Sequence, residues 1–187
     1  MIILSILLSC GFWYISNKLP EYEYRLPKML LKITSLITLI DTYLDIDPIS
    51  PQYYKYFVLV FYLLGDLIIV WNELISVPFF IIGHLICILS HMIHLPWLIL
   101  LCILISPTLL LISMIVYIIL DEPDVIYLAY TYILGVILII TTVNGYYGYI
   151  LMIISDIIII SRISSVQFLT WPLYYISIYT FINYHYL

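Results

Sequence analysis

The sequence predicts an all-α protein, a polytopic membrane helical bundle of about eight transmembrane helices. Of its 187 residues, 65% are hydrophobic and 9% are charged, and the mean hydropathy is +1.18. A soluble domain carries about 25% charged residues, so this chain cannot cover a water-exposed surface with polar groups. The same apolar content excludes intrinsic disorder. A membrane-spanning helix needs about 20 apolar residues, so residues 1–187 are expected to form one integral membrane domain with short loops.

Each expected helix is an apolar segment close to spanning length, and helix breakers separate most of the segments. Strands of a membrane barrel would alternate apolar and polar residues, but the runs Leu98–Leu104 and Ile157–Ile160 are apolar throughout. In chain order, the segments are Ile2–Ser16, Met29–Leu44, Tyr54–Trp71, Val77–Leu95, Trp97–Leu120, Val125–Val143, Tyr146–Arg162 and Val166–Tyr186. The breakers, in the same order, are Pro20 and Pro27, Pro48 and Pro51, Pro78, Pro96, Pro123 and Gly145.

Positive charges predict the orientation. The first segment is expected to remain as a helix, because no positive charge precedes it as in a cleaved secretory signal. Positive charges gather after it, Arg162 follows the seventh segment, and the opposite loops hold only Lys55. The positive-inside rule therefore places both termini outside the cytoplasm. The charges after the first segment are Lys18, Arg25, Lys28 and Lys32.

The remaining composition limits the partners. The net charge is -5 and no run of Lys or Arg occurs, so membrane lipids are expected partners and nucleic acid is not. The three cysteines, Cys10, Cys87 and Cys102, lie in apolar runs and form no Cys-x-x-Cys pair. This pattern is typical of apolar packing rather than of a disulfide or zinc framework. There is no P-loop, dinucleotide fingerprint or Gly-x-Ser-x-Gly motif, so no cofactor is expected.

Two aspartates, Asp66 and Asp156, lie inside apolar segments, where a carboxylate costs about 2.5–3.5 kcal/mol. Both are expected about 8–9 Å from the cytoplasmic edge, on helices that run in the same direction. They are therefore predicted to meet in the bundle, where Gly65 and Gly148 leave room for a cavity. Two carboxyl groups at low dielectric do not both ionise easily, which would give an acid and a base. The alternative is that each is hydrogen-bonded and only locks the bundle.

The fourth segment carries His84, His91 and His94 within one helix face. The spacing of His91 and His94 is compatible with metal ligands, but histidines hydrogen-bonded near a helix end are the favoured interpretation, and no metal is expected. By depth, His84 lies closer than His91 to the two aspartates. Glu73 is expected in the loop between the third and fourth segments.

Five short patterns follow one another between Lys28 and Ile178. They are Lys28-Met29-Leu30; Gly65-Asp66; Phe80, Gly83, Cys87, His91 and His94; Gly148, Met152, Ser155 and Asp156; and Tyr174-Tyr175. Their order and spacing resemble those of the YhhN-type membrane family, which includes the lysoplasmalogenases. The chain departs from the family pattern at Met29, Cys87, His94, Met152 and Ile178, where the family has Pro, Phe, Tyr, Phe and Gln or His.

What this resemblance implies is a hydrolase that cleaves the vinyl-ether bond of lysoplasmalogen, a lysophospholipid, and releases a fatty aldehyde and glycerophosphoethanolamine or glycerophosphocholine. Vinyl ethers hydrolyse by protonation at carbon, and glycosidases handle a related oxocarbenium ion with two carboxyl groups. Asp66 and Asp156 are therefore the expected acid/base pair. The expected substrate-binding residues are Lys28, as a point charge for the phosphate, with His91, Tyr174 and Tyr175, and the expected cavity-lining residues are Gly65, Gly83, His84, Gly148 and Ser155.

Two other functions fit the same residues. A proton-coupled transporter or channel would also use intramembrane Asp and His side chains, although neither internal repeats nor broken helices are visible. A non-catalytic membrane scaffold or viral envelope protein is the third interpretation, and it would keep its assembly without Asp66 or Asp156. The sequence leaves the host membrane and the oligomeric state open.

Overall fold

The computed structural model describes residues 54–120, 124–161 and 169–183, together with Leu7, Gly11, Tyr14 and Ile15. Within these residues the chain is helical and has no strand, which confirms the predicted all-α class. In this part of the chain, the helices are α3 (Tyr54–Ile68), α4 (Glu73–His94), α5 (Trp97–Leu120), α6 (Val125–Val143), α7 (Gly148–Ser161) and α8 (Thr170–Asn183). Apart from those four residues of the first expected segment, the first two expected segments lie outside the described residues, as do the positive charges after the first of them.

Three of these helices are long and apolar enough to cross a membrane, namely Glu73–Ile93, Trp97–Ile119 and Val125–Val143. This indicates a membrane-associated protein. The bounds of α5 and α6 coincide with the predicted segments, while α3 ends at Ile68 before the predicted Trp71 and α7 begins at Gly148 after the predicted Tyr146.

The predicted start of the fourth helix at Val77 is wrong, because α4 begins at Glu73. The Asn72 side chain accepts a hydrogen bond of 3.1 Å from the backbone N–H of Ile75 and so caps the helix. The negative charge of Glu73 then lies in the first turn, where it is favourable for the helix dipole. Pro78, expected as a breaker, lies inside α4.

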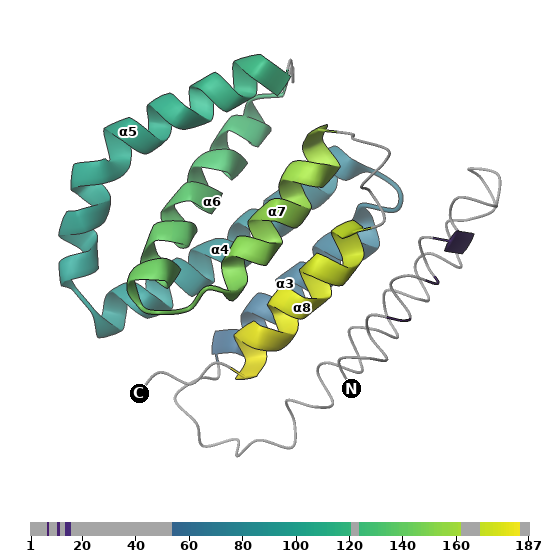
Figure 1. Cartoon of the computed structure of the whole chain (residues 1–187), viewed down its shortest axis with the longest axis horizontal. Coiled ribbons are helices and arrows are strands. Elements are labelled where there is room, and N and C mark those ends of the chain that lie inside the picture. The colour runs from purple at the N-terminus through teal and green to yellow at the C-terminus, as the bar shows by residue number, and fades with distance from the viewer. Residues whose placement is uncertain are drawn as a thin grey trace.

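The helices pack mainly as neighbours in sequence. The pairs α3 and α4, α7 and α8, and α5 and α6 lie against each other, and α6 also contacts α4 and α7. Figure 1 shows α7 and α8 in front of α3 and α4, with α6 beside them and α5 outermost. One end of the bundle therefore holds the end of α3, the start of α4, the start of α6, the end of α7 and the start of α8 (Figure 1).

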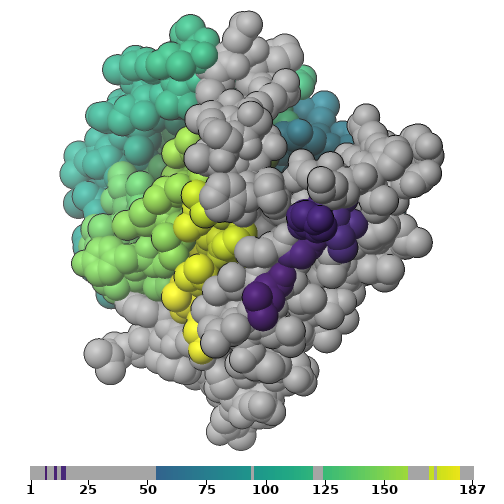
Figure 2. All heavy atoms as spheres, turned by 45° about the vertical axis from the view of Figure 1, so that its right-hand side comes forward, coloured from purple at the N-terminus to yellow at the C-terminus, as the bar shows by residue number. Residues whose placement is uncertain are grey.

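The outermost helix, α5, is bent and mostly exposed. Pro107 lies inside it, and the missing N–H of a mid-helix proline is a common cause of such a bend. Its strongly apolar surface forms the edge of the molecule in the space-filling view (Figure 2). A hydrogen bond of 2.6 Å between the hydroxyl groups of Ser106 and Tyr132 joins α5 to α6.

The turn between α6 and α7 forms at a glycine. Gly145 has a φ of 76°, a left-handed conformation that favours glycine because it has no Cβ. The preceding residue, Asn144, ends α6, and its backbone N–H donates a hydrogen bond of 3.2 Å to the carbonyl oxygen of Ile140. The predicted break at Gly145 is therefore confirmed.

Candidate functional site

A pocket opens at the end of the bundle where α3 stops and α4 begins, and five helices line it. Its cavity volume is about 40 Å³, more than the roughly 10–15 Å³ that one water molecule needs. The polar lining residues are Asp66, Glu73, Ser76, Tyr127, Tyr130, Ser155, Asp156 and Tyr174, and the apolar ones are Ile69, Val77, Phe80 and Ile159.

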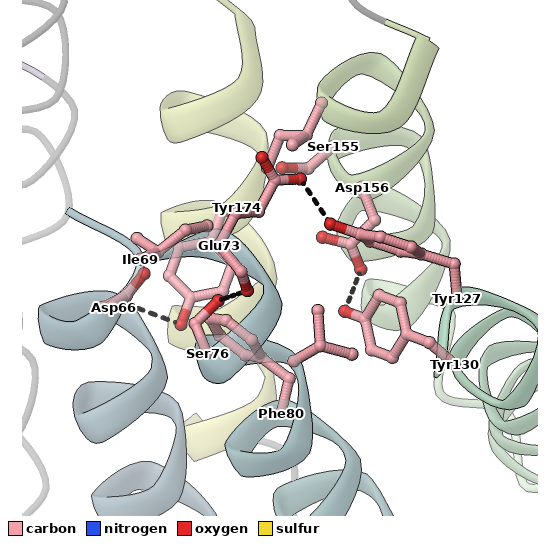
Figure 3. A pocket seen from close by; sticks show the side chains of 12 residues that line it. Asp66, Ile69, Glu73, Ser76, Phe80, Tyr127, Tyr130, Ser155, Asp156 and Tyr174 are labelled. Atoms are coloured by element: carbon pink, nitrogen blue, oxygen red, sulfur yellow. Dashed lines mark hydrogen bonds between the residues drawn. The ribbon is translucent and has the colours of Figure 1, made fainter. Parts of the chain in front are cut away.

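Asp66 and Asp156, which are 90 positions apart in the chain, lie on opposite sides of this pocket (Figure 3). Both are buried, with 1% and 9% of their surface exposed. The Tyr174 hydroxyl donates to Asp66 Oδ2 at 2.9 Å, and the Tyr130 hydroxyl donates to Asp156 Oδ2, also at 2.9 Å. Each buried carboxyl group thus has a neutral donor, which offsets the cost of removing it from water.

A third carboxyl group lines the pocket. Glu73 begins α4 instead of lying in a loop, so the predicted loop position is wrong. Its Oε1 accepts a hydrogen bond of 3.0 Å from the Tyr127 hydroxyl (Figure 3). The Ser76 hydroxyl donates a hydrogen bond of 2.6 Å to the backbone oxygen of Glu73.

Gly65, which was expected to line the cavity, is not part of the lining but packs against Phe80, which is. A Cβ at this position would lie 2.8 Å from two ring atoms of Phe80, so only glycine lets that ring lie so close to α3. Phe80 in turn lines the pocket one helical turn below Ser76.

A second polar layer lies one to two helical turns deeper. His84 Nδ1 and the Tyr62 hydroxyl are 2.7 Å apart, and the Tyr62 hydroxyl is 2.9 Å from the Tyr149 hydroxyl. All three side chains are fully buried. Gly83 makes room for this layer, because a Cβ there would lie 2.5 Å from Tyr62 Cε1.

The other predicted site residues fall in different places. Ser155 and Tyr174 line the pocket, and the Ser155 hydroxyl also donates to the carbonyl oxygen of Thr170 at 2.9 Å. Three more lie away from the pocket lining: Tyr175 packs its ring beside Tyr174, His91 is bonded to the backbone oxygen of Cys87, and Gly148 lies against Tyr146 and Thr180. The predicted phosphate ligand Lys28 lies outside the described residues.

Sequence reasoning missed Tyr130, Tyr127 and Ser76 as pocket residues. The chain has 20 tyrosines, so residue type alone does not single out Tyr127 or Tyr130. Glu73 did carry a signal, since it lies seven residues after Asp66, two helical turns if the helix had continued.

The chemistry available to the pocket is proton transfer. It offers carboxyl groups, phenol donors and space for water within an apolar surround. In the parts of the chain that the structure describes, no group of three or more His, Cys, Asp or Glu side chains could hold a metal ion.

Comparison with known proteins assigns no family to the chain. No family model matches the chain, and no match was found among curated proteins or solved structures.

Proposed function

We propose that the protein is a membrane hydrolase that cleaves the vinyl-ether bond of a lysoplasmalogen by acid/base catalysis. One observation carries the proposal: Asp66 of α3 and Asp156 of α7 line the same water-sized cavity, each with its own tyrosine hydroxyl. The resemblance of the chain to the YhhN-type family supplies the substrate class.

The reaction proceeds by four proton transfers in two stages. One carboxylic acid protonates the β-carbon of the vinyl ether, which gives an oxocarbenium ion that the second carboxylate stabilises. That carboxylate then takes a proton from a water molecule as the water attacks the cation. The roles then reverse as the hemiacetal breaks down. The first group, now a carboxylate, takes the hemiacetal hydroxyl proton, and the second, now an acid, protonates the glycerol oxygen as its C–O bond breaks, which releases a fatty aldehyde and the glycerophospho headgroup. The overall change consumes one water molecule and leaves both carboxyl groups as they began.

The surroundings favour this role over a purely structural one. Two carboxyl groups in one low-dielectric cavity repel each other when both are ionised, so one of them is expected to hold a proton. The tyrosine donors carry no charge and therefore do not neutralise the remaining carboxylate. The apolar lining of Ile69, Val77 and Ile159 would accept the first carbons of the alkenyl chain.

The proposal includes a multi-pass chain of about eight spans, with the pocket facing the cytoplasmic leaflet. The apolar segments that precede α3 and the positive charges between them support this topology. A lysophospholipid lying in that leaflet would reach the pocket with its ether bond a short distance below the headgroups.

The test is aldehyde release from purified full-length protein in detergent, with lysoplasmalogen as substrate and the saturated alkyl ether of the same headgroup as comparison. The vinyl ether alone should react. Asp66→Asn and Asp156→Asn should each lower kcat at least 100-fold, because each removes a group that gives or takes a proton.

The matched control is Asp124→Asn, since Asp124 precedes α6 and its side chain makes no capping hydrogen bond. This variant should keep full activity. Equal rates for wild-type protein and both pocket variants would contradict the proposal, as would the absence of aldehyde from any vinyl-ether lysolipid. A scaffold would instead keep its assembly state in the pocket variants, which size-exclusion chromatography measures.

A further inference from the structure

A stripe of buried polar side chains continues from the pocket along the inner face of α4. Ser76, His84, Cys87 and His91 lie at helical spacings on this face, and at most 3% of any of them is exposed. Phe80 occupies the one intervening turn. At 1.5 Å per residue, the stripe from Ser76 to His91 covers about 22 Å of helix, and His91 lies three residues before the last residue of α4.

The deeper part of the stripe is a connected chain of hydrogen-bonding groups. His84 Nδ1 is 2.7 Å from the Tyr62 hydroxyl, which is 2.9 Å from the Tyr149 hydroxyl. Cys87 lies in the same buried core cluster as Tyr149. Its Sγ is 3.9 Å from His91 Nδ1, which is also 2.7 Å from the backbone oxygen of Cys87. Every side chain in the chain can both accept a proton and release one.

At its end near the pocket, this series of hydrogen-bonding side chains stops at the His84 ring. His84 Nε2 is fully buried and has no hydrogen-bond partner among the described residues. The His84 ring lies 5.8 Å, centroid to centroid, from the ring of Tyr130, whose hydroxyl binds Asp156 in the pocket. Phe80 covers the same region from α4, with its ring 6.1 Å from that of Tyr62. The chain therefore stops one layer of aromatic rings short of the carboxyl groups.

Stability does not account for this arrangement. A buried hydrogen bond contributes only about 0.5–1.5 kcal/mol net, and a buried nitrogen without a partner costs about 1–3 kcal/mol. Leu or Phe side chains of similar volume would fill the same space without that cost. Buried ionisable groups in a membrane bundle more often mark a route for protons or ions.

We propose that Tyr62, His84, Tyr149, Cys87 and His91 form a proton path that links the carboxyl pocket to the opposite end of α4. Each group takes a proton at one atom and releases another proton to its neighbour, so only O–H, N–H and S–H bonds form and break. Rotation of the Phe80 and Tyr130 rings would bring His84 Nε2 within reach of a pocket carboxyl group or its water. This activity is independent of lipid hydrolysis.

The test uses the full chain in proteoliposomes that contain a pH-sensitive dye, with a potassium gradient and valinomycin to drive proton uptake. Wild-type vesicles should change pH faster than protein-free vesicles. Tyr62→Phe should lower the rate at least fivefold, because it keeps the ring but removes the hydroxyl that connects His84 to Tyr149. Phe80→Ala should raise the rate, because it removes one of the two rings between the path and the pocket.

Tyr132→Phe is the matched control, since it removes a tyrosine hydroxyl that binds Ser106 outside the path, and its rate should equal that of wild type. Should Tyr62→Phe fail to fold, Tyr149→Phe breaks the same chain at the next link and should show the same loss. Wild-type flux no faster than that of protein-free vesicles, or unchanged flux when either hydroxyl is removed, would overturn the proposal. Aldehyde release is measured separately, so failure of the hydrolase proposal leaves this result standing.

Discussion

At the scale of single residues, the pocket pairs carboxyl groups with phenols. Three carboxyl groups, from Asp66, Glu73 and Asp156, each accept a hydrogen bond from a different tyrosine. A phenol can solvate a carboxylate without adding a positive charge, whereas Lys or Arg would hold the carboxylate permanently ionised. At the two buried sites, Asp66 and Asp156, such a pair lets the carboxyl group exchange its proton away from bulk water.

The tyrosine at the Asp156 site should therefore matter for activity. Tyr130→Phe keeps the ring but leaves Asp156 without its donor, and a hydrogen bond to a charged group contributes about 1.5–3 kcal/mol. We expect kcat for aldehyde release to fall about 10- to 100-fold. Tyr132→Phe, which lies outside the pocket, should leave kcat unchanged. Equal kcat values for the two variants would contradict a role for this hydroxyl.

Gly83 should be sensitive to the smallest substitution. In Gly83→Ala the added methyl group would lie 2.5 Å from Tyr62 Cε1, and such overpacking costs about 1–3 kcal/mol. We expect a lower thermal unfolding midpoint in detergent. Gly11→Ala is the control, because a Cβ at Gly11 has no neighbour within 4 Å, and its midpoint should not fall. A Gly83→Ala midpoint equal to that of wild type would show that the Tyr62 ring moves aside freely.

At the scale of helices, α4 and α5 differ in the polarity and the exposure of their side chains. The inner face of α4 carries the polar stripe, and its first turn is fixed by the Asn72 cap. In contrast, α5 is apolar on all sides and is exposed over most of its length. Because lipid chains are as apolar as its side chains, α5 gains little hydrophobic free energy by moving from lipid to a contact with protein. Its hydrogen bond to α6 adds to the side-chain packing between the two helices.

The Ser106–Tyr132 pair should behave as a coupled unit in a double-mutant cycle. Ser106→Ala and Tyr132→Phe each remove the same hydrogen bond, so either change alone is expected to cost about 0.5–1.5 kcal/mol of unfolding free energy. The double variant should cost about the same as one single variant. Denaturation in mixed micelles, followed by tryptophan fluorescence, measures the four free energies. Strictly additive costs would mean that the two hydroxyl groups do not interact.

At the scale of the whole molecule, successive helices place the pocket at one end of the bundle. Trp71 and Val125 lie at this end, while Trp97 and Tyr147 lie at the other, and all four are more than half exposed. The intervening α4 has 22 residues, about 33 Å of helix, which matches the hydrocarbon core of a bilayer.

Single cysteines should report this topology in a variant whose native cysteines are alanine. A membrane-impermeant maleimide should label Trp71→Cys and Val125→Cys from one side of sealed vesicles, and Trp97→Cys and Tyr147→Cys only from the other. Ile103→Cys is the control, since Ile103 is 63% exposed on α5 but would face lipid, and it should resist the reagent from both sides. Labelling of all four ends from one side would exclude a spanning bundle.

The sequence by itself determined the helical class, the bounds of α5 and α6 and the break at Gly145, because hydropathy and helix breakers act along the chain. It also singled out Asp66 and Asp156, since a carboxyl group in an apolar run is costly wherever the run packs. The number of spans and the orientation stay predictions from hydropathy and charge.

Only the tertiary structure decided which side chains meet. It selected Tyr127 and Tyr130 among 20 tyrosines as pocket donors, and it brought Glu73 into the pocket. The reason is that each residue turns the helix by 100°, and a helix that is apolar on every face carries no local preference for which side points inward. That rotation is set by contacts with other helices, such as the Phe80 ring against Gly65 and the Tyr62 ring against Gly83.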